Sequence, residues 1–199
     1  MSNDAATVFN EKLLYPTYEI IGGVKILAPS ANLIHSKIIV RLLIHFENYF
    51  FQHQNGYVFA DDVDVHFPDG SIYKPDLIVV SKENENILEW HKAIFGAPDM
   101  VVEVLSQSTK RNDETIKKDT YEKFGVKEYW IVNPYMQSIE VYILRDGKYE
   151  LDSSDYVIYN DEEWRKLNDE QKAASKTTIS PTIFPEIKIR LIDIFSWRY

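Results

Sequence analysis

Three ionisable side chains near the middle of the sequence have residue types and spacings that suit phosphodiester chemistry. Asp76 comes directly before the apolar run at residues 77–80, and Glu103 lies inside a second apolar run at residues 100–105. Lys117 follows on the next predicted helix. Carboxylate oxygens are the ligands that Mg²⁺ prefers, and a nearby lysine can neutralise a phosphate. Two carboxylates and a lysine held on a small sheet are therefore the parts of a magnesium-dependent phosphodiesterase site.

Glu103 is the most informative of these residues because its neighbours on both sides are aliphatic. Burying an unpaired carboxylate in such a strand would cost several kcal/mol. Glu103 must therefore pair with a base, bind a metal or face a cleft, and a purely structural pair with Lys or Arg remains an alternative. Asp76 follows Pro75, which suits the start or edge of a strand, so its carboxylate is either solvated or a ligand.

The phase of the predicted helix at residues 109–124 indicates which of its side chains face the sheet. At about 100° per residue, Asp113, Lys117 and Tyr121 form a polar stripe that is turned toward the sheet, whereas Lys118 points roughly the opposite way. The same face carries three residues suited to packing: Ile116, Thr120 and Phe124. An exposed i, i+4 ion pair would contribute only a few tenths of a kcal/mol. The inward phase instead favours a site and selects Lys117 over Lys118.

Other acidic and histidine residues have simpler interpretations. Asp99 precedes Glu103 by four residues, about 13 Å along a strand, so we do not expect the two to share a metal. Asp62 and Asp64 share one strand face, which either lines the cleft or, as we predict, is a polar sheet face. His45 is interpreted as structural, and the role of His35 stays open. No phosphate-binding loop, zinc-protease motif or nucleophile elbow is present.

A sheet and two helices are predicted to position these side chains. The predicted strands are the hairpin 17–28 with its turn at Gly22-Gly23, then 57–66, 72–80, 99–105, 127–133 and 138–145. The predicted helices run from an N-cap at Ser30 to Phe51, and from Ser108 or Thr109 to a stop at Gly125. Residues 83–97 are expected to form an exposed loop or a short helix, and the tail to be peripheral. This order indicates an α/β fold with a central mixed sheet.

The composition limits which classes of protein this chain can belong to. The 199 residues are 45% hydrophobic, which suffices for one domain over residues 1–199 with its core at about 30–145. No apolar stretch approaches the roughly 20 residues that span a bilayer, and the first residues lack the pattern of a signal peptide. The sequence contains no cysteine, so it has neither disulfides nor thiolate metal sites. We therefore expect a soluble, cytoplasmic protein.

The net charge of −9, from 22 basic and 31 acidic residues, argues against nucleic acid as a partner. Basic residues do gather locally around the second helix, namely Lys110, Arg111, Lys117, Lys118, Lys123 and Lys127. They form either an ordinary solvated helix face or part of a binding surface. A dimer or a partner subunit would also supply positive surface.

The order of the motifs resembles a known family. PDLIVV, then APDMVVEVLSQST, then Asp113-x-x-x-Lys117-x-x-x-Tyr121, then GVKEYWIVNP is similar to the restriction endonuclease-like family first catalogued as a domain of unknown function. That family belongs to the PD-(D/E)XK nuclease superfamily. The resemblance extends from the YEIIGG hairpin through the SANLIHSK helix start to the final strand.

The resemblance implies a restriction endonuclease-like core, with Asp76 as the acid of the Pro-Asp motif and Glu103 as the second acid. Leu105 occupies the position where the superfamily usually has its lysine, so Lys117 on the helix corresponds to a relocated catalytic lysine. Asp76, Glu103 and the backbone carbonyl of Val104 are expected to bind Mg²⁺ or Mn²⁺. Asp113 and Tyr121 are expected to position Lys117 without binding the metal themselves.

The activity implied is hydrolysis of DNA phosphodiester bonds, by an enzyme that is commonly a twofold homodimer. Two alternatives stay open. The acidic net charge and Leu105 are also compatible with a nuclease fold that serves as a binding or assembly module without catalysis. A smaller phosphodiester or nucleotide is a third candidate substrate, because an acidic surface would repel it less.

Overall fold

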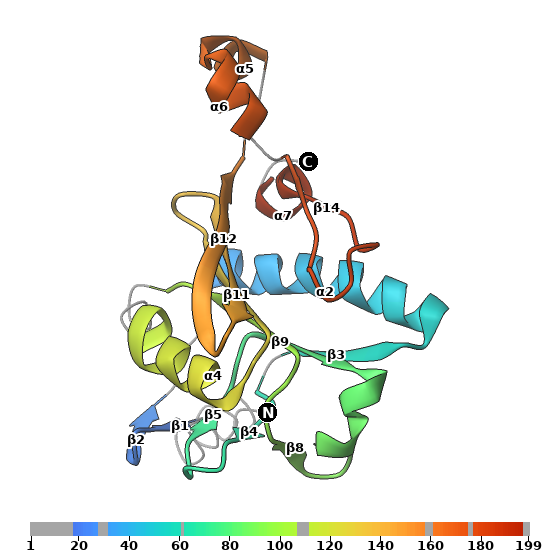
Figure 1. Ribbon diagram of the computed structural model, residues 1–199, viewed down its shortest axis with the longest axis vertical. Coiled ribbons are helices and arrows are strands. Elements are labelled where there is room, and N and C mark those ends of the chain that lie inside the picture. Colours follow the sequence, from blue (N-terminus) through green and yellow to red (C-terminus); the bar gives the residue numbers. More distant parts are fainter. Residues whose placement is uncertain are drawn as a thin grey trace, which may run out of the picture.

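The computed structural model describes residues 18–27, 32–60, 62–106, 112–157, 161–174 and 177–196. In these ranges it contains two six-stranded sheets, a two-stranded ribbon and several helices (Figure 1). The larger central sheet is mixed, and helices cover it on both faces. The predicted α/β class is confirmed.

The central sheet has the strand order β12-β11-β10-β9-β6-β3, in which only β9 and β10 are parallel neighbours. Its strands are β3 (Gly56–Ala60), β6 (Leu77–Ser81), β9 (Met100–Val104), β10 (Glu128–Asn133), β11 (Ser138–Arg145) and β12 (Lys148–Tyr156). All five residues of β9 are buried, because side chains pack against both of its faces. This burial explains the unbroken apolar runs of the sequence.

The smaller sheet has the order β2-β1-β5-β4-β8-β7 and packs below the central one in Figure 1. Its strands are β1 (Tyr18–Ile21), β2 (Val24–Leu27), β4 (Val65–His66), β5 (Ile72–Tyr73), β7 (Leu88–Glu89) and β8 (Ala93–Phe95). The hairpin of β1 and β2 is confirmed, with Gly22 and Gly23 at positive φ.

Two predicted strands proved to be two strands each. The range 57–66 divides into β3 and β4, and 72–80 divides into β5 and β6, with one half in each sheet. Asp62 adopts a left-handed conformation (φ 63°), which interrupts the first, and Pro75 has no N–H to donate to a ladder, which interrupts the second. Between residues 57 and 80 the chain therefore crosses from the central sheet to the smaller sheet and back again.

The long helix α2 (Leu33–His53) lies across one face of the central sheet (Figure 1). Its buried residues recur every four positions from Ile38 to Phe50, as an amphipathic helix requires. Asn32 is its N-cap, accepting a hydrogen bond from the backbone N–H of His35 at 2.9 Å. The predicted cap at Ser30 lies outside the described residues.

The second predicted helix begins with a π-helical turn, η2 (Asp113–Lys117), and continues as α4 (Lys118–Phe124). Gly125 ends it at φ 87°, as predicted, while the cap predicted at Ser108 or Thr109 lies outside the described residues. Ile116 was expected on the inner face but is 45% exposed. The wider π turn changes the angular position of residues relative to an ideal α-helix, which explains this error.

Residues 83–97, expected to form a loop or a short helix, instead contain most of the 3-10 helix η1 (Lys82–Ile87) and the strands β7 and β8. Strand β12 was not predicted, because most of its nine residues are polar or exposed and give no apolar alternation.

The tail is less peripheral than its sequence indicated. It contains α5 (Asp161–Lys166), α6 (Asp169–Ala174), β13 (Thr178–Ile179), β14 (Ile189–Arg190) and α7 (Leu191–Phe195). Helices α5 and α6 do lie apart from the sheets (Figure 1). From β13 onward, however, seven side chains enter the main core: Ile179, Phe184, Ile187, Ile189, Leu191, Ile194 and Phe195. Helix α7 packs on α2, whose apolar surface would otherwise be only partly covered.

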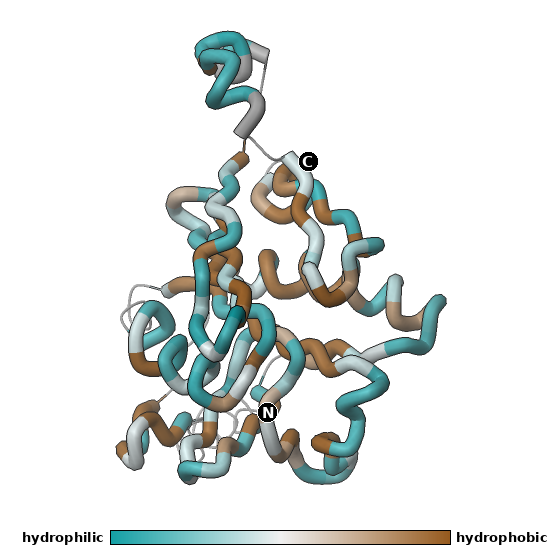
Figure 2. Tube along the Cα trace, in the orientation of Figure 1, coloured by the Kyte–Doolittle hydropathy of each residue, from teal (hydrophilic) through white to brown (hydrophobic). Residues whose placement is uncertain are grey.

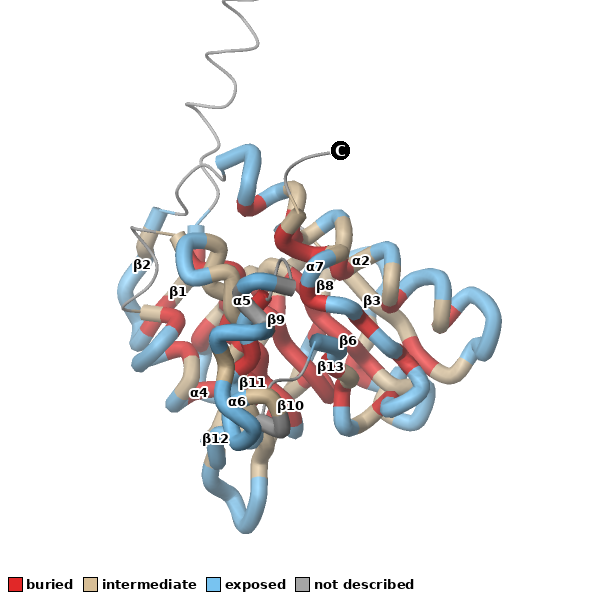
Figure 3. The backbone as a smooth tube through the Cα atoms, turned by 90° about the horizontal axis from the view of Figure 1, so that it is seen from above, coloured by how far each residue is buried: buried red, intermediate tan, exposed pale blue. Residues whose placement is uncertain are grey.

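Two apolar cores lie on opposite faces of the central sheet. One joins alternate strand residues to α2 and the end of the tail, and the other joins the remaining strand residues to the smaller sheet and α4. Apolar positions concentrate on the central strands and the inner face of α2 (Figure 2), which are also the buried ones (Figure 3). None of the described helices is long and apolar enough to cross a membrane.

Candidate active site

The strand register brings Asp76 and Glu103 opposite one another. Strands β6 and β9 are antiparallel, and Leu77 pairs with Val102. Extending this register by one residue sets Asp76 across from Glu103, where side chains on one sheet face lie about 5 Å apart at Cβ. Both belong to the face that packs against α4 and the smaller sheet. The two acids singled out from the sequence therefore meet.

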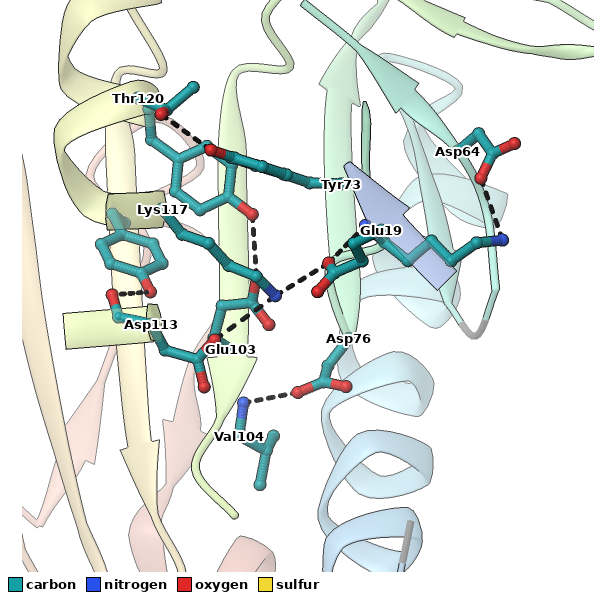
Figure 4. Close-up of polar contacts among 12 residues, drawn as sticks. Glu19, Asp64, Tyr73, Asp76, Glu103, Val104, Asp113, Lys117 and Thr120 are labelled. Atoms are coloured by element: carbon teal, nitrogen blue, oxygen red, sulfur yellow. Dashed lines mark hydrogen bonds and ion pairs between the residues drawn. The ribbon is translucent and has the colours of Figure 1, made fainter. Parts of the chain in front are cut away.

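Lys117 lies at the centre of a buried ion-pair cluster (Figure 4). Its Nζ is 2.9 Å from Glu19 Oε1, 3.2 Å from Glu103 Oε1 and 3.3 Å from Asp113 Oδ1. Only 4% of the lysine side chain is exposed. The π-helical turn carries Asp113 and Lys117 inward together, so Lys117 faces the sheet as the helical phase indicated. Lys118 instead stands over the ring of Tyr142, 3.4 Å from its centroid.

Hydrogen bonds from two tyrosine hydroxyls hold residues of this cluster in place. The Tyr121 hydroxyl donates to Glu103 Oε1 at 2.8 Å, and the Tyr129 hydroxyl donates to the backbone carbonyl of Asp113 at 3.0 Å. Burial, reinforced by the charge of Glu103, raises the pKa of Tyr121 well above its ordinary value. The Tyr121 hydroxyl therefore stays protonated, and its hydrogen bond is made to Oε1 of Glu103. No described residue donates to the other, Oε2.

Asp76 is held by two contacts to a single carboxylate oxygen. Its Oδ2 accepts the backbone N–H of Val104 at 2.7 Å and lies 3.1 Å from Nε2 of His35. Its Oδ1 receives no hydrogen bond from the described residues. The backbone of Val104 thus lies beside both acids, since it follows Glu103 directly. On each of the two carboxylates, one oxygen thus receives no hydrogen bond from the described residues.

The cluster carries more negative than positive charge. Glu19, Glu103 and Asp113 surround one ammonium, and Asp76 adds a fourth carboxylate nearby. Burial, followed by the charges of Asp113, Asp76 and Glu19, raises the pKa of Glu103 well above its ordinary value against the opposing effect of Lys117. Burial alone would lower the pKa of Lys117, but the surrounding carboxylates raise it, so the lysine stays protonated.

A family model matches residues 12–164 of this chain, and its description is "Uma2: Putative restriction endonuclease". The chain belongs to this family. Among solved structures it is similar to a protein described as "a putative nuclease belonging to DUF820" from Anabaena variabilis ATCC 29413, at 21% identity and a TM-score of 0.67. The alignment covers 94% of this chain and 97% of that one, and it shows that the fold is the restriction endonuclease-like one. A comparison with curated proteins found no match.

Membership of the Uma2 family confirms the resemblance drawn from the motifs, and the structure places all of the predicted site residues in one region. Asp76, Glu103 and the backbone of Val104 meet at the ends of β6 and β9, with Asp113, Lys117 and Tyr121 on the adjoining helix. Their roles in the reaction stay predictions.

Three other acids lie outside the cluster. Asp99, directly before β9, accepts hydrogen bonds from Lys127 Nζ at 2.6 Å and from the backbone N–H of Ser81 at 2.7 Å. Asp62 and Asp64 both pair with Lys74, at 2.6 and 2.9 Å. The interpretation of Asp62 and Asp64 as a polar sheet face was wrong, because β3 ends before them and the left-handed turn at Asp62 leads out of the strand.

The sequence interpretation missed Glu19. It lies on β1, and its Oε1 accepts the backbone N–H of Lys74 at 2.8 Å as well as contacting Lys117. Strand alternation carried a signal, because Glu19 shares a face with Ile21, which is buried. An acid on the core face of a hairpin needs a partner for the same reason as Glu103 does. His35, whose role the sequence left open, lies against Asp76.

The residues present fit a divalent cation by charge and by donor type. A surplus of carboxylates around one lysine is the environment that a cation neutralises, and Asp76 and Glu103 each have one oxygen to which no described residue donates. The described part of the chain contains no preformed group of three His, Asp or Glu side chains that could hold a metal. A cation would therefore be held by the two carboxylates and the Val104 carbonyl.

Proposed function

We propose that this protein is a metal-dependent endonuclease that hydrolyses phosphodiester bonds in DNA. The observation that carries the proposal is the placement of Lys117 beside Glu103, with Asp76 directly across the strand pair. The description of the Uma2 family, "Putative restriction endonuclease", supports the same reaction class. The proposed catalytic residues are Asp76, Glu103 and Lys117, and the proposed cofactor is Mg²⁺ or Mn²⁺.

In the reaction, a water oxygen forms a bond to phosphorus while the bond from phosphorus to the leaving sugar oxygen breaks. Asp76, Glu103 and the carbonyl of Val104 would hold the cation. When bound, the cation supplies Lewis-acid stabilisation of the negative charge on the phosphate and acidifies water. The Lys117 ammonium, already protonated, donates a hydrogen bond to a phosphate oxygen and offsets the charge that develops there.

Three residues prepare Lys117 for that role. Asp113 contacts its ammonium from the same helix, and Glu19 does so from the smaller sheet. Tyr121 acts indirectly, because its hydroxyl donates a hydrogen bond to Glu103, which in turn contacts the ammonium. Because these contacts involve three separate elements, the lysine has little freedom to leave the position between them, which favours a preorganised site.

The decisive experiment measures cleavage of supercoiled plasmid and of branched DNA with Mg²⁺ or Mn²⁺. Asp76→Asn and Glu103→Gln are each expected to lower the rate at least about a hundredfold, because each removes a charged ligand. Asp119→Asn, an exposed carboxylate on α4, is the matched control and should cleave like the wild type. Unchanged cleavage by both site variants would exclude this reaction at this site.

A nuclease fold that binds without cleaving is the second candidate. It is favoured by Leu105, which fills the usual lysine position with a buried apolar side chain, and by the net charge of −9. Calorimetric titration separates the two functions. Mn²⁺ binding that disappears in Glu103→Gln supports the enzyme, whereas a wild type that binds neither Mn²⁺ nor Mg²⁺ supports the binding module.

We further propose a homodimer, because two active sites related by a twofold axis suit the two strands of duplex DNA. Sedimentation velocity at micromolar concentration should give the mass of two chains, each of 23.3 kDa. Sedimentation at the mass of one chain over the whole concentration range would contradict this part of the proposal without affecting the site.

A further inference from the structure

The outward side of helix α2 carries an apolar stripe where a surface helix normally has polar residues. Ile38, Leu42 and Phe46 are the buried side. At about 100° per residue, the opposite side of the helix presents six residues in one narrow row, the outer stripe: Leu33, Lys37, Val40, Ile44, Glu47 and Phe51. Exposed positions recur along α2 in Figure 3. Leu33 and Phe51 are 90% and 79% exposed, and Val40 and Ile44 are about half exposed. Large apolar side chains gathered in this way mark an interaction surface.

The spacing of the outer stripe indicates the shape of its partner. Successive members are separated by four and three residues in strict alternation over the length of the helix. This is the period of a coiled-coil seam, in which side chains of one helix fit between those of another at a crossing angle of about 20°. The surface therefore fits a second helix of the same period.

The apolar members of the stripe are complementary to themselves. They lie symmetrically about Leu42, since Leu33 and Phe51 are equally far from it along the chain, and so are Val40 and Ile44. If a second α2 packs antiparallel with a twofold axis at the level of Leu42, Leu33 faces Phe51 of the second copy. Val40 then faces Ile44 of the second copy. A twofold interface requires this kind of self-complementary surface.

The two charged members obey the same symmetry. Lys37 and Glu47 are also equally far from the centre, so the antiparallel arrangement sets each against the opposite charge of the second copy. A parallel arrangement would instead set like charges against each other, which is unfavourable. A lipid surface is a poorer match, because helices that lie on membranes gather basic residues, whereas this stripe contains Glu47 and the chain has a net charge of −9.

We propose that the outer stripe of α2 is the interface of the homodimer, formed by antiparallel packing of α2 on α2 of a second copy. This inference rests on the homodimer of the proposed function and names its surface. It is independent of the chemistry at Asp76, Glu103 and Lys117.

Sedimentation velocity of the full-length protein tests the surface. The wild type should sediment as two chains of 23.3 kDa each. Ile44→Glu places a carboxylate in the middle of the seam in both copies, and should weaken dimerisation at least about a hundredfold. Leu151→Glu, an equally exposed apolar residue on β12, is the matched control and should sediment like the wild type. Circular dichroism establishes that each variant is folded.

A charge exchange tests the antiparallel register. Lys37→Glu and Glu47→Lys each oppose like charges across the interface, and should each weaken dimerisation about tenfold or more. The double variant Lys37→Glu/Glu47→Lys opposes unlike charges again, and should return to within about threefold of the wild type.

Cross-linking gives a direct readout, because the sequence contains no cysteine. In the antiparallel dimer, Leu33 lies beside Phe51 of the second copy, whereas the two copies of Leu33 are about 27 Å apart along the helix axis. A short bismaleimide should therefore link chains in an equilibrated mixture of Leu33→Cys and Phe51→Cys, but not in either variant alone.

Each contrary result has a distinct meaning. A dimer that persists in Ile44→Glu overturns the α2 interface while the homodimer stands. Failure of the charge exchange to restore dimerisation, or cross-linking within Leu33→Cys alone, overturns the antiparallel register. A wild type that stays monomeric overturns the interface and the homodimer together, and its binding to anionic lipid vesicles would assign the stripe to membranes. None of these results bears on the nuclease site, which is tested separately by cleavage in Asp76→Asn.

Discussion

Lys117 is buried in a place where a lone lysine would be unstable. Taking an ammonium out of water is expensive, and here Glu19, Glu103 and Asp113 offset that cost through contacts of 2.9 to 3.3 Å. The three carboxylates depend on the lysine in the same way, because they are buried as well and need a positive partner. Removing Lys117 should therefore affect folding and function together, whereas removing Lys118 should affect neither.

We expect Lys117→Met to lower DNA cleavage about a hundredfold or more and to destabilise the fold by roughly 3–5 kcal/mol, because three buried carboxylates lose their counterion. Lys118→Met, whose side chain lies over Tyr142, serves as the control. Plasmid cleavage and urea unfolding followed by circular dichroism measure the two effects. Full activity in Lys117→Met would remove the lysine from the mechanism.

Asp99 gives the stability of the fold a dependence on pH. Although burial opposes it, the hydrogen bonds from Lys127 and Ser81 lower the pKa of Asp99. A carboxyl whose pKa is lowered by folding stabilises the protein above its unfolded pKa of about 3.9, and this contribution is lost as the pH falls through the folded pKa.

Wild type should therefore exceed Asp99→Asn in unfolding free energy by about 1–3 kcal/mol at neutral pH, and the difference should shrink below about pH 4. Urea unfolding of both proteins at a series of pH values measures it. A difference that stays constant down to pH 2 would show that the charge of Asp99 is not responsible.

At the scale of elements, the helix formed by η2 and α4 determines which side chains reach the sheet. The π turn directs Asp113 and Lys117 inward together, and α4 then carries Tyr121 to Glu103. Gly125 ends the helix in a left-handed conformation, where its N–H bonds to the carbonyls of Tyr121 and Glu122. Strand β10 starts three residues later, so this turn sets the position of the helix on the sheet.

Gly125→Ala should destabilise the protein by about 1 kcal/mol, because alanine is strained at a φ of 87°. No atom lies within 4 Å of the added Cβ, so steric clash adds nothing. Gly125→Asn should cost less, since asparagine tolerates the left-handed region better. Thermal unfolding of the three proteins measures the order, and equal stability of Ala and Asn variants would argue against backbone strain.

At the scale of the whole molecule, the C-terminal segment completes the core over α2. The Arg41 guanidinium donates to the backbone carbonyl of Ile194 at 2.9 Å, and Glu128 accepts the backbone N–H of Thr182 at 2.8 Å. These bonds attach the segment to α2 and to β10. The fold therefore depends on residues far beyond those that carry the proposed chemistry.

Phe195→Ala should cost about 3–5 kcal/mol, because the ring is fully buried in the core beneath α2. Ile192→Ala, on the same helix but 37% exposed, is the control and should cost about 1 kcal/mol or less. Urea denaturation measures both. Small and equal losses would mean that α7 is as peripheral as the sequence indicated.

The sequence by itself determined Asp76, Glu103 and Lys117, together with Asp113 and Tyr121, as members of one region. Each was recognisable from local information: an acid inside an apolar strand, or a polar stripe with helical spacing. Their selection needed only the periods of strands and helices, which a few residues reveal. The hairpin turn at Gly22-Gly23 and the helix stop at Gly125 were predictable for the same reason.

Only the tertiary structure brought Glu19 and His35 to the site and carried the tail into the core. His35 and Asp76 are 41 residues apart in the sequence, and Glu19 reaches Lys117 from a different sheet. Such contacts arise from how strands pair and helices pack, and no local period encodes them. The division of two predicted strands between the sheets is a third case, because the packing of the sheets, rather than strand propensity, decided where each part pairs.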